Sequence, residues 1–184
     1  MKQLFSGRGG AARLTRVGMG GAILCLLAPF SIPLAGAVPI TLGSFAAAFL
    51  GLFLGPWEGA GSVLLYLALG AVGLPVFSGG RGGAGHLFGP TGGFLFGFLL
   101  LAFLSGLFRE KKGRVLGVIA GEAALYLVGT LWYVLIAKAA FLPALTVCCF
   151  PFLPGDAVKC ALALILYRLI RKRVPADRHS ETKE

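Results

Sequence analysis

Apolar stretches make up most of the chain, and they are interrupted only by short links rich in glycine and proline. Hydrophobic residues account for 57% of the 184 residues, and charged residues for only 13%. A water-soluble domain carries about 25% charged residues, so this chain has too few polar side chains to cover a soluble surface. The excess apolar surface must face lipid, and we predict an integral membrane protein.

A helix that crosses a bilayer needs roughly 20 residues, so the chain has room for about six such helices and short loops. We predict spans at residues 14–34, 40–54, 57–73, 91–108, 115–140 and 152–170. The expected fold is therefore all-α, with a single membrane domain over residues 1–184. Residues 1–13 are expected to form a cytoplasmic N-terminal tail, and residues 174–184 a disordered cytoplasmic tail.

The basic residues determine the predicted orientation. All but three of the 17 Lys and Arg lie in residues 2–16, 109–114 and 168–183, and each of these groups flanks an apolar run. Cytoplasmic loops of membrane proteins are enriched in Lys and Arg. An even number of spans places all three groups and both termini in the cytoplasm. We therefore expect a multi-pass protein of the bacterial cytoplasmic membrane, and the net charge of +10 does not indicate nucleic-acid binding.

A glycine-rich link at residues 74–86 joins the third and fourth predicted spans. Irregular backbone at membrane depth is tolerated where it is buried in protein or lines a wet cavity, and binding residues concentrate on such loops. We expect this loop to fold over a ligand, with Phe77 and Arg81 pointing inward. The alternative is a floppy external connection.

The fourth span begins with Pro90, followed by Thr91, Gly92 and Gly93. Pro is favoured at a first helical position, and two glycines would leave backbone N–H groups exposed at the positive end of the helix. A ligand carboxylate or carbonyl could bind there. Alternatively, the glycines serve close packing of helices.

Asp156 and Lys159 lie three residues apart near the outer start of the last span, so they share a helix face. Ionised groups within a membrane span mostly face a cavity or each other. The carboxylate accepts from N–H groups and the ammonium donates to C=O groups. The pair would suit a ligand that carries both groups, although a structural ion pair is the alternative.

Glu122 lies in the first part of the fifth span, near the basic inner end. We expect it to pair with Lys111, Lys112 or Arg114, with a proton relay as the alternative. On the first span, Gly18 and Ala22 are four residues apart, the spacing of small residues that pack closely against a partner protein or a neighbouring helix.

The chain lacks a cluster of His, Cys and acidic residues on one side of the membrane, so no enzymatic activity and no metal are expected. It also lacks the Gly-x-x-x-x-Gly-Lys-Ser/Thr phosphate-binding motif, so any use of ATP must come from partner subunits. Two kinds of transport protein fit these features. One is a subunit that binds a small molecule and relies on ATPase partners. The alternative is a self-sufficient, proton-coupled secondary transporter of a small vitamin-like molecule that uses Asp156 or Glu122.

Four stretches of the chain together resemble one known family. They are VPITL (Val38–Leu42), GPWEGAGSVLLYLALGAVGLPVF (Gly55–Phe77), GPTGGFLFGF (Gly89–Phe98) and PFLPGDAVKCALA (Pro151–Ala163). The chain is similar to the BioY family, the biotin-specific substrate-binding components of energy-coupling-factor (ECF) transporters. The resemblance implies a six-helix membrane protein that captures biotin on the outer side. Its implied partners are a transmembrane coupling subunit and two ATPases, with biotin as the transported ligand and no cofactor of its own.

The resemblance also implies where the ligand and the coupling subunit bind. The implied ligand contacts are Thr41, Tyr66, Phe77, Gly79, Gly80, Arg81, Thr91, Gly92, Asp156 and Lys159. Among them, Asp156 and Lys159 would hold the ureido ring of biotin. Gly18 and Ala22 on the first span would meet the coupling subunit.

The remaining parts of biotin suggest further assignments. The apolar thiophane ring and tail would pack on aromatic side chains such as Phe77, Tyr66 or Trp132. The carboxylate would favour Arg81 or the helix start at Thr91.

The chain departs from the family pattern at two places. Gly43 stands where many members have Gln, and Ser78, Gly79 and Gly80 occupy a region where some members have Asn. Backbone groups or water are expected to replace the missing polar side chains.

Overall fold

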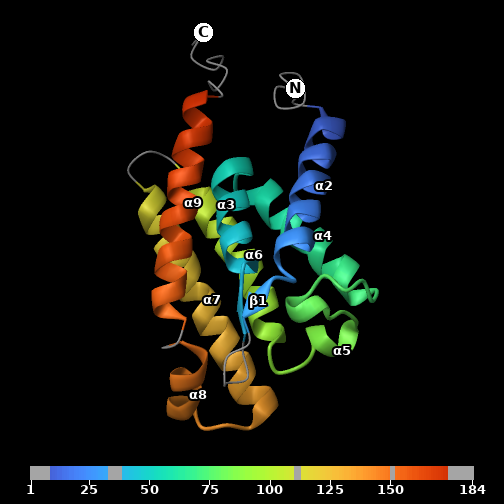
Figure 1. Cartoon of the computed structure of the whole chain (residues 1–184), viewed down its shortest axis with the longest axis vertical. Coiled ribbons are helices and arrows are strands. Elements are labelled where there is room, and N and C mark those ends of the chain that lie inside the picture. The colour runs from blue at the N-terminus through green and yellow to red at the C-terminus, as the bar shows by residue number, and fades with distance from the viewer. Residues whose placement is uncertain (1–8, 33–38, 110–112, 150–151, 174–184) are drawn as a thin grey trace.

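Long helices run along the main axis of the molecule in the computed structural model, which describes residues 9–32, 39–109, 113–149 and 152–173 (Figure 1). The long helices in these ranges are α2 (Gly10–Leu27), α3 (Gly43–Leu54), α4 (Pro56–Ala71), α6 (Gly92–Leu107), α7 (Arg114–Ala137) and α9 (Leu153–Arg173). The short elements are β1 (Ser31–Ile32), β2 (Ile40–Thr41), the 3-10 turn η1 (Ser78–Gly80), α5 (Ala84–Leu87) and α8 (Phe141–Cys148). The predicted all-α class is confirmed, apart from the two-residue strands.

Most of the helix boundaries follow from Gly and Pro. α4, α6, α7 and α9 begin and end within three residues of the predicted spans. The short helix α8 was not foreseen, because residues 141–148 follow the fifth predicted span without a polar link.

The first predicted span is wrong at its C-terminal end. The helix stops at Leu27 and the chain enters β1, which pairs antiparallel with β2 through Ser31 opposite Thr41. Pro29 has no backbone N–H, so it cannot continue the helical hydrogen-bond pattern. The second helix begins at Gly43 and not at residue 40, because Ile40 and Thr41 form β2.

Of the two predicted tails, the structure describes only part of the N-terminal one. α2 begins at Gly10, so the last part of the predicted N-terminal tail is helical. The predicted disordered tail at residues 174–184 lies outside the described residues.

Two of the described helices, α2 and α7, are long and apolar enough to cross a membrane by length and composition. The apolar helices α3 and α6 are shorter than a full crossing requires. The count of six spans therefore stays a prediction. The start of α2 and the end of α9 lie at the same end of the molecule, as the predicted topology requires (Figure 1).

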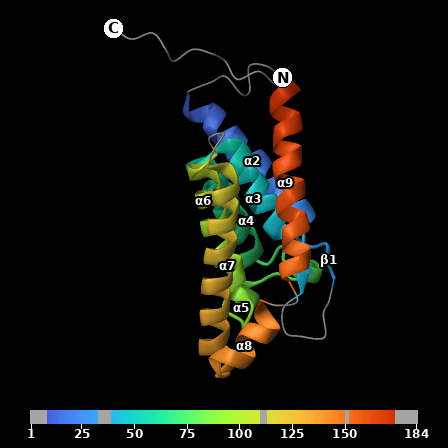
Figure 2. The same cartoon turned by 90° about the vertical axis from the view of Figure 1, so that its left-hand side faces the viewer.

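Helix α6 lies at the centre of the bundle. It packs against α3, α4 and α7, while α3 lies between α6 and α9 (Figure 2). α2 packs mainly against α4. Large apolar side chains remain exposed on the outer faces of these helices, among them Leu14, Leu26, Leu64, Leu135 and Leu162.

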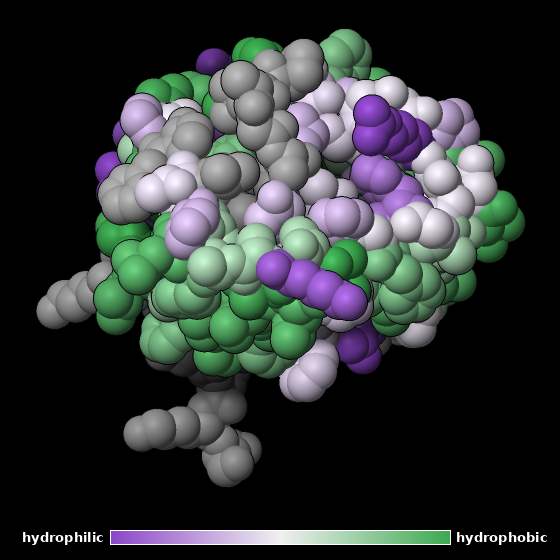
Figure 3. Space-filling view, turned by 90° about the horizontal axis from the view of Figure 1, so that it is seen from below, coloured by the Kyte–Doolittle hydropathy of each residue, from purple (hydrophilic) through white to green (hydrophobic). Residues whose placement is uncertain are grey.

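The end of the molecule that holds α5 and α8 presents hydrophobic side chains over part of its surface, beside weakly coloured and hydrophilic ones (Figure 3). A monomeric soluble protein rarely exposes as many large apolar side chains as the helices of this molecule do. The exposed apolar surface therefore fits a lipid environment.

Glycine allows α3, α4 and α6 to approach each other closely. A Cβ atom at Gly51 would run into the backbone carbonyl of Ala102 on α6, and one at Gly59 would lie 2.8 Å from the Cα of Gly51. Small residues let helix backbones pack closely in membranes, where the hydrophobic effect does not drive helices together.

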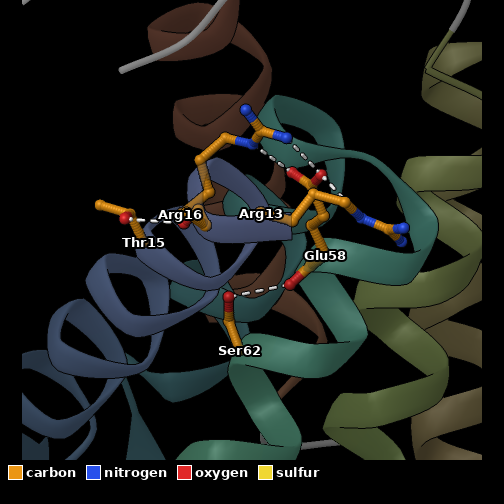
Figure 4. Close-up of polar contacts among 6 residues, drawn as sticks. Arg13, Thr15, Arg16, Glu58 and Ser62 are labelled. Atoms are coloured by element: carbon orange, nitrogen blue, oxygen red, sulfur yellow. Dashed lines mark hydrogen bonds and ion pairs between the residues drawn. The ribbon is translucent and has the colours of Figure 1, made fainter. Parts of the chain in front are cut away.

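An ion-pair cluster near the start of α2 joins α2 to α4 (Figure 4). The Arg16 guanidinium donates to both carboxylate oxygens of Glu58, with Nε–Oε2 at 2.6 Å and Nη2–Oε1 at 2.7 Å. Arg13 lies farther away, with 3.7 Å between its Nε and Oε1 of Glu58. Such bidentate Arg–carboxylate pairs add geometric specificity to their energy, so this pair sets the position of α2 against α4.

Replacement of Gly51 by alanine is expected to destabilise the bundle, because the Ala102 carbonyl belongs to the backbone and cannot rotate away. We expect a loss of about 1–3 kcal/mol of stability, measured by thermal unfolding of the purified protein in detergent. Gly18→Ala is the matched control, because a Cβ atom there meets nothing within 4 Å. Equal stability of the two variants would contradict the close approach of α3 and α6.

Candidate functional site

A cavity of about 330 Å³ lies in the half of the bundle that holds β1, α5 and α8. Its walls come from α3, α4, α6, α7 and α9, together with the β1–β2 pair and the glycine-rich loop. Its size falls in the range of small-molecule sites, which are mostly apolar with a few placed polar groups. The polar wall residues are Ser31, Thr41, Ser44, Tyr66, Ser78, Arg81, His86, Thr91, Tyr126, Asp156 and Lys159.

Asp156 and Lys159 form a buried ion pair on the first turns of α9. The Lys159 ammonium lies 2.7 Å from Oδ1 of Asp156. Lys159 is only 9% exposed and Asp156 only 6%. The carboxylate accepts a further hydrogen bond from the hydroxyl of Tyr126, and the ammonium donates to Oγ of Ser44 at 3.2 Å. The predicted pair therefore exists, and it faces the cavity.

Tyr126 on α7 and Ser44 on α3 were missed as site residues. Both lie far from α9 in the chain, and Lys159 is 115 residues away from Ser44. Nothing in the spacing of a single sequence pairs a residue of α9 with residues of α3 or α7. The only available signal was that Tyr126 and Ser44 are polar residues within apolar helices.

An apolar wall completes the cavity between its polar groups. It is formed by Phe94, Leu95, Phe98, Leu125 and Phe152. These residues were also missed, because aromatic and aliphatic residues are abundant throughout the apolar spans.

The glycine-rich loop lies against the cavity. An antiparallel bridge closes it, with the Phe77 amide donating to the Arg81 carbonyl at 2.8 Å. Gly79 and Gly80 adopt φ values of 70° and 71°, which favour glycine. Ser78, Gly79 and Arg81 line the cavity, whereas Gly80 does not.

Phe77 lies behind the cavity wall and not on it. Its ring is fully buried in edge contact with Tyr66 and stacked on His86, and both of these neighbours line the cavity. Phe77 therefore supports two wall residues. The pKa of His86 lies below its usual value, mainly because of burial and also because of the nearby Arg81 charge. Arg81 is thus the cation at this end of the cavity.

The start of α6 differs from the prediction. Thr91 lines the cavity, but the amide of Gly92 donates to the carbonyl of Gly89 and is not free for a ligand. The indole N–H of Trp132 donates to the same carbonyl at 2.9 Å. Trp132 therefore stabilises the turn before α6. It does not line the cavity, so it is not in a position to pack against a ligand.

Two buried hydroxyls at the cavity lack a partner among the described residues, namely those of Tyr66 and Ser78. Tyr66 is fully buried, and both residues line the cavity. A buried polar group without a hydrogen bond is unfavourable. These hydroxyls are therefore available to a bound molecule.

Glu122 does not pair with Arg114, one of its three predicted partners. Arg114 lies over the ring of Tyr167, with its guanidinium carbon 4.5 Å from the ring centre. Glu122 accepts instead from the thiol of Cys160 on α9 at 3.5 Å. Lys111 and Lys112, the other predicted partners, lie outside the described residues.

Gly18 and Ala22 lie on a face of α2 that the described residues leave open. Ala22 is exposed, and a Cβ atom at Gly18 would meet nothing within 4 Å. Helix α4 contacts a different face, where Gly20 and Gly21 are buried. Within the described ranges, no group of three His, Cys, Asp or Glu residues could hold a metal ion.

Comparisons with known proteins agree on one family. Residues 1–176 match the family model described as the BioY family. The chain is 39% identical over 180 residues to a biotin transporter BioY of Rhodobacter capsulatus, covering 89% of this chain and 95% of that protein. It is 42% identical over 131 residues to a probable biotin transporter BioY of Pyrococcus horikoshii, covering 71% and 79% of the two chains.

A solved structure shares the fold. It is the crystal structure of the S-component for biotin from an ECF-type ABC transporter, with a TM-score of 0.80 and 32% sequence identity. The match covers 88% of this chain and 92% of that chain.

Removal of one partner of the buried ion pair is expected to destabilise the protein strongly. In Lys159→Met, the Asp156 carboxylate keeps only the Tyr126 hydroxyl, and a buried charge without its counter-ion costs about 3–5 kcal/mol. The double variant Asp156→Asn/Lys159→Met should recover much of this loss, because no charge remains unpaired. Thermal unfolding of the ligand-free protein measures both effects.

Lys138→Met is the matched control, because Lys138 is exposed at the end of α7. If Lys159→Met were as stable as this control, the ion pair would not have the predicted energetic role.

Proposed function

Because the chain belongs to the BioY family, we propose that it is the biotin-capturing S-component of an ECF-type vitamin transporter. The observation that carries the proposal is the buried Asp156–Lys159 pair on the wall of the cavity. The relatives are named as biotin transporters, and the similar solved structure is an S-component for biotin. These names describe transport and substrate binding, not catalysis.

The ureido ring of biotin matches the ion pair chemically. It offers two N–H donors and a strong carbonyl acceptor, which suit the Asp156 carboxylate and the Lys159 ammonium. Tyr126 and Ser44 hold the two charged groups in place. A site whose polar groups are already oriented loses less entropy when the ligand binds.

The rest of biotin fits the remainder of the cavity. The thiophane ring and the tail pack on the apolar wall that includes Phe94, Phe98 and Phe152. Arg81 at the glycine-rich loop provides the positive charge for the carboxylate. The hydroxyls of Tyr66 and Ser78, which lack a partner in the described part of the chain, are further hydrogen-bonding groups for the ligand.

The departure at Gly43 has a structural counterpart. The ring of Phe98 lies 2.9 Å from the position of a Cβ atom at Gly43, and Oγ1 of Thr41 lies 3.2 Å from it. A larger side chain at position 43 would therefore displace one of these wall residues. Phe98 occupies space next to the place where many family members carry Gln.

The proposed partners are the ECF transmembrane coupling subunit and two ATPases. The exposed small-residue face of α2, at Gly18 and Ala22, is the proposed contact with the coupling subunit. We place the protein in the bacterial cytoplasmic membrane as a multi-pass protein, with the ion-pair cluster of Arg16 and Glu58 at the cytoplasmic end. The alternative, a self-sufficient proton-coupled secondary transporter, would not depend on these partner subunits for uptake.

Calorimetric titration of the detergent-purified protein is expected to show tight binding of biotin and no binding of riboflavin or thiamine. Asp156→Asn should weaken biotin binding by roughly 10- to 150-fold, because a hydrogen bond to a charged group contributes about 1.5–3 kcal/mol. Glu58→Gln is the matched control, since Glu58 is a carboxylate that pairs with Arg16 on α2 and does not line the cavity. A folded, ligand-free preparation that did not bind biotin would disprove the proposed ligand.

Bulky residues on the open face of α2 are expected to block assembly without affecting the ligand. Gly18→Leu and Ala22→Leu should lower co-purification with the coupling subunit at least about tenfold, the effect of 1.4 kcal/mol, while the Kd for biotin stays unchanged. Ala161→Leu is the matched control, because Ala161 is an exposed alanine on α9. Normal assembly of both α2 variants would mean that another face binds the coupling subunit.

A further inference from the structure

Glu122 lies about one helical turn from the wall of the ligand cavity, towards the start of α7. On α7 it precedes Leu125 and Tyr126 by about one helical turn, and both of these residues line the cavity. Its partner Cys160 follows Lys159 on α9. A carboxyl group thus lies one helical turn from the proposed biotin site without being part of the cavity wall.

The carboxyl group of Glu122 is buried and only partly hydrogen-bonded. The residue is 8% exposed, and its Oε1 accepts from the thiol of Cys160 at 3.5 Å. A thiol is a weak donor. Oε2 is buried and has no hydrogen-bond partner among the described residues.

The neighbouring elements do not neutralise a charge on Glu122. α3 and α6 contain no ionisable side chain at all. From α9, the titratable or charged neighbours are Asp156, Lys159 and Cys160, and from α7 the neighbour is Tyr126.

The charges of this group do not balance when every carboxyl is ionised. The Lys159 ammonium already pairs with Asp156 at 2.7 Å. An ionised Glu122 would therefore add one uncompensated negative charge to an apolar interior, and such a charge is strongly unfavourable. A proton on Glu122 removes this charge and provides an O–H donor.

We propose that Glu122 is a proton-binding site linked to the ligand cavity, and that the protein binds biotin more tightly when Glu122 is protonated. This inference rests on the proposed function and adds a second ligand, the proton, to the same site. Its structural basis is the buried and incompletely bonded carboxyl group, one turn before Tyr126 on α7 and in contact with Cys160, the residue after Lys159.

The direction of the linkage follows from electrostatics. An ionised Glu122 attracts the Lys159 ammonium, which the ureido carbonyl of biotin needs as a donor. It also repels Asp156, which must remain ionised to accept from the ureido N–H groups. Ionisation of Glu122 therefore weakens ligand binding, and by linkage a bound ligand raises the proton affinity of Glu122.

The test is calorimetry of biotin binding to the full-length wild-type protein, from about pH 6 to about pH 8.5, above the range in which a free carboxyl group titrates. We expect the Kd to increase at least about fivefold as the pH rises, the lower end of typical coupling between two sites. Titrations in buffers of different ionisation enthalpy should show net proton uptake on binding. His86 has a lowered pKa, so its own titration falls towards or below the lower end of this range.

Glu122→Gln mimics the protonated residue without changing its shape. We expect this variant to bind biotin at high pH as tightly as the wild-type protein does at low pH, without proton uptake. Cys160→Ala is the matched control, because it removes the thiol partner but keeps the carboxyl group, and its pH dependence should persist.

A Kd that is independent of pH in the wild-type protein, with no proton uptake, would overturn the proposal. The same conclusion would follow if Glu122→Gln kept the wild-type pH dependence. In either case biotin binding itself remains measurable, so the proposed function would stand. Absence of biotin binding at every pH would instead reject the proposed function. The wild-type measurement suffices if the variant does not fold.

Discussion

Lys159 and Asp156 are buried together, and much of the cavity follows from this ion pair. An ammonium in an apolar bundle needs a counter-ion and further acceptors, and a carboxylate needs further donors. Ser44 on α3 and Tyr126 on α7 meet these needs. α9 must therefore lie where both side chains can be reached, between the start of α3 and the middle of α7. The pair itself forms part of the cavity wall.

The same pair explains why the protein can carry a polar cavity wall without loss of stability when no ligand is bound. The two charged groups of the pair are bonded to each other and to the hydroxyls of Tyr126 and Ser44. Elsewhere on the wall, the hydroxyls of Tyr66 and Ser78 have no hydrogen-bond partner among the residues that the structure describes. The site thus combines one end that is preorganised by internal hydrogen bonds with another whose hydrogen bonds depend on a bound molecule.

Helix positions and the Asp156–Lys159 pair could be predicted because they depend on local sequence. Apolar runs and Pro or Gly breaks define α4, α6, α7 and α9, and a spacing of three places two residues on one helix face. The partners Tyr126 and Ser44 could not be predicted, since they come from distant segments. Glu122 shows the same limit. Its closeness to the basic end along the chain does not reveal that its side chain faces Cys160 on α9.

The order of the segments along the chain affects how the protein is made. The first wall residues of the cavity come from the end of α2, whereas the charged pair comes from α9, the last of the described helices. A chain still emerging from the ribosome can therefore form the apolar walls, but it cannot form the ligand site until α9 has inserted. Ligand capture is thus restricted to completed chains, and a bound vitamin stabilises only molecules whose membrane insertion is finished.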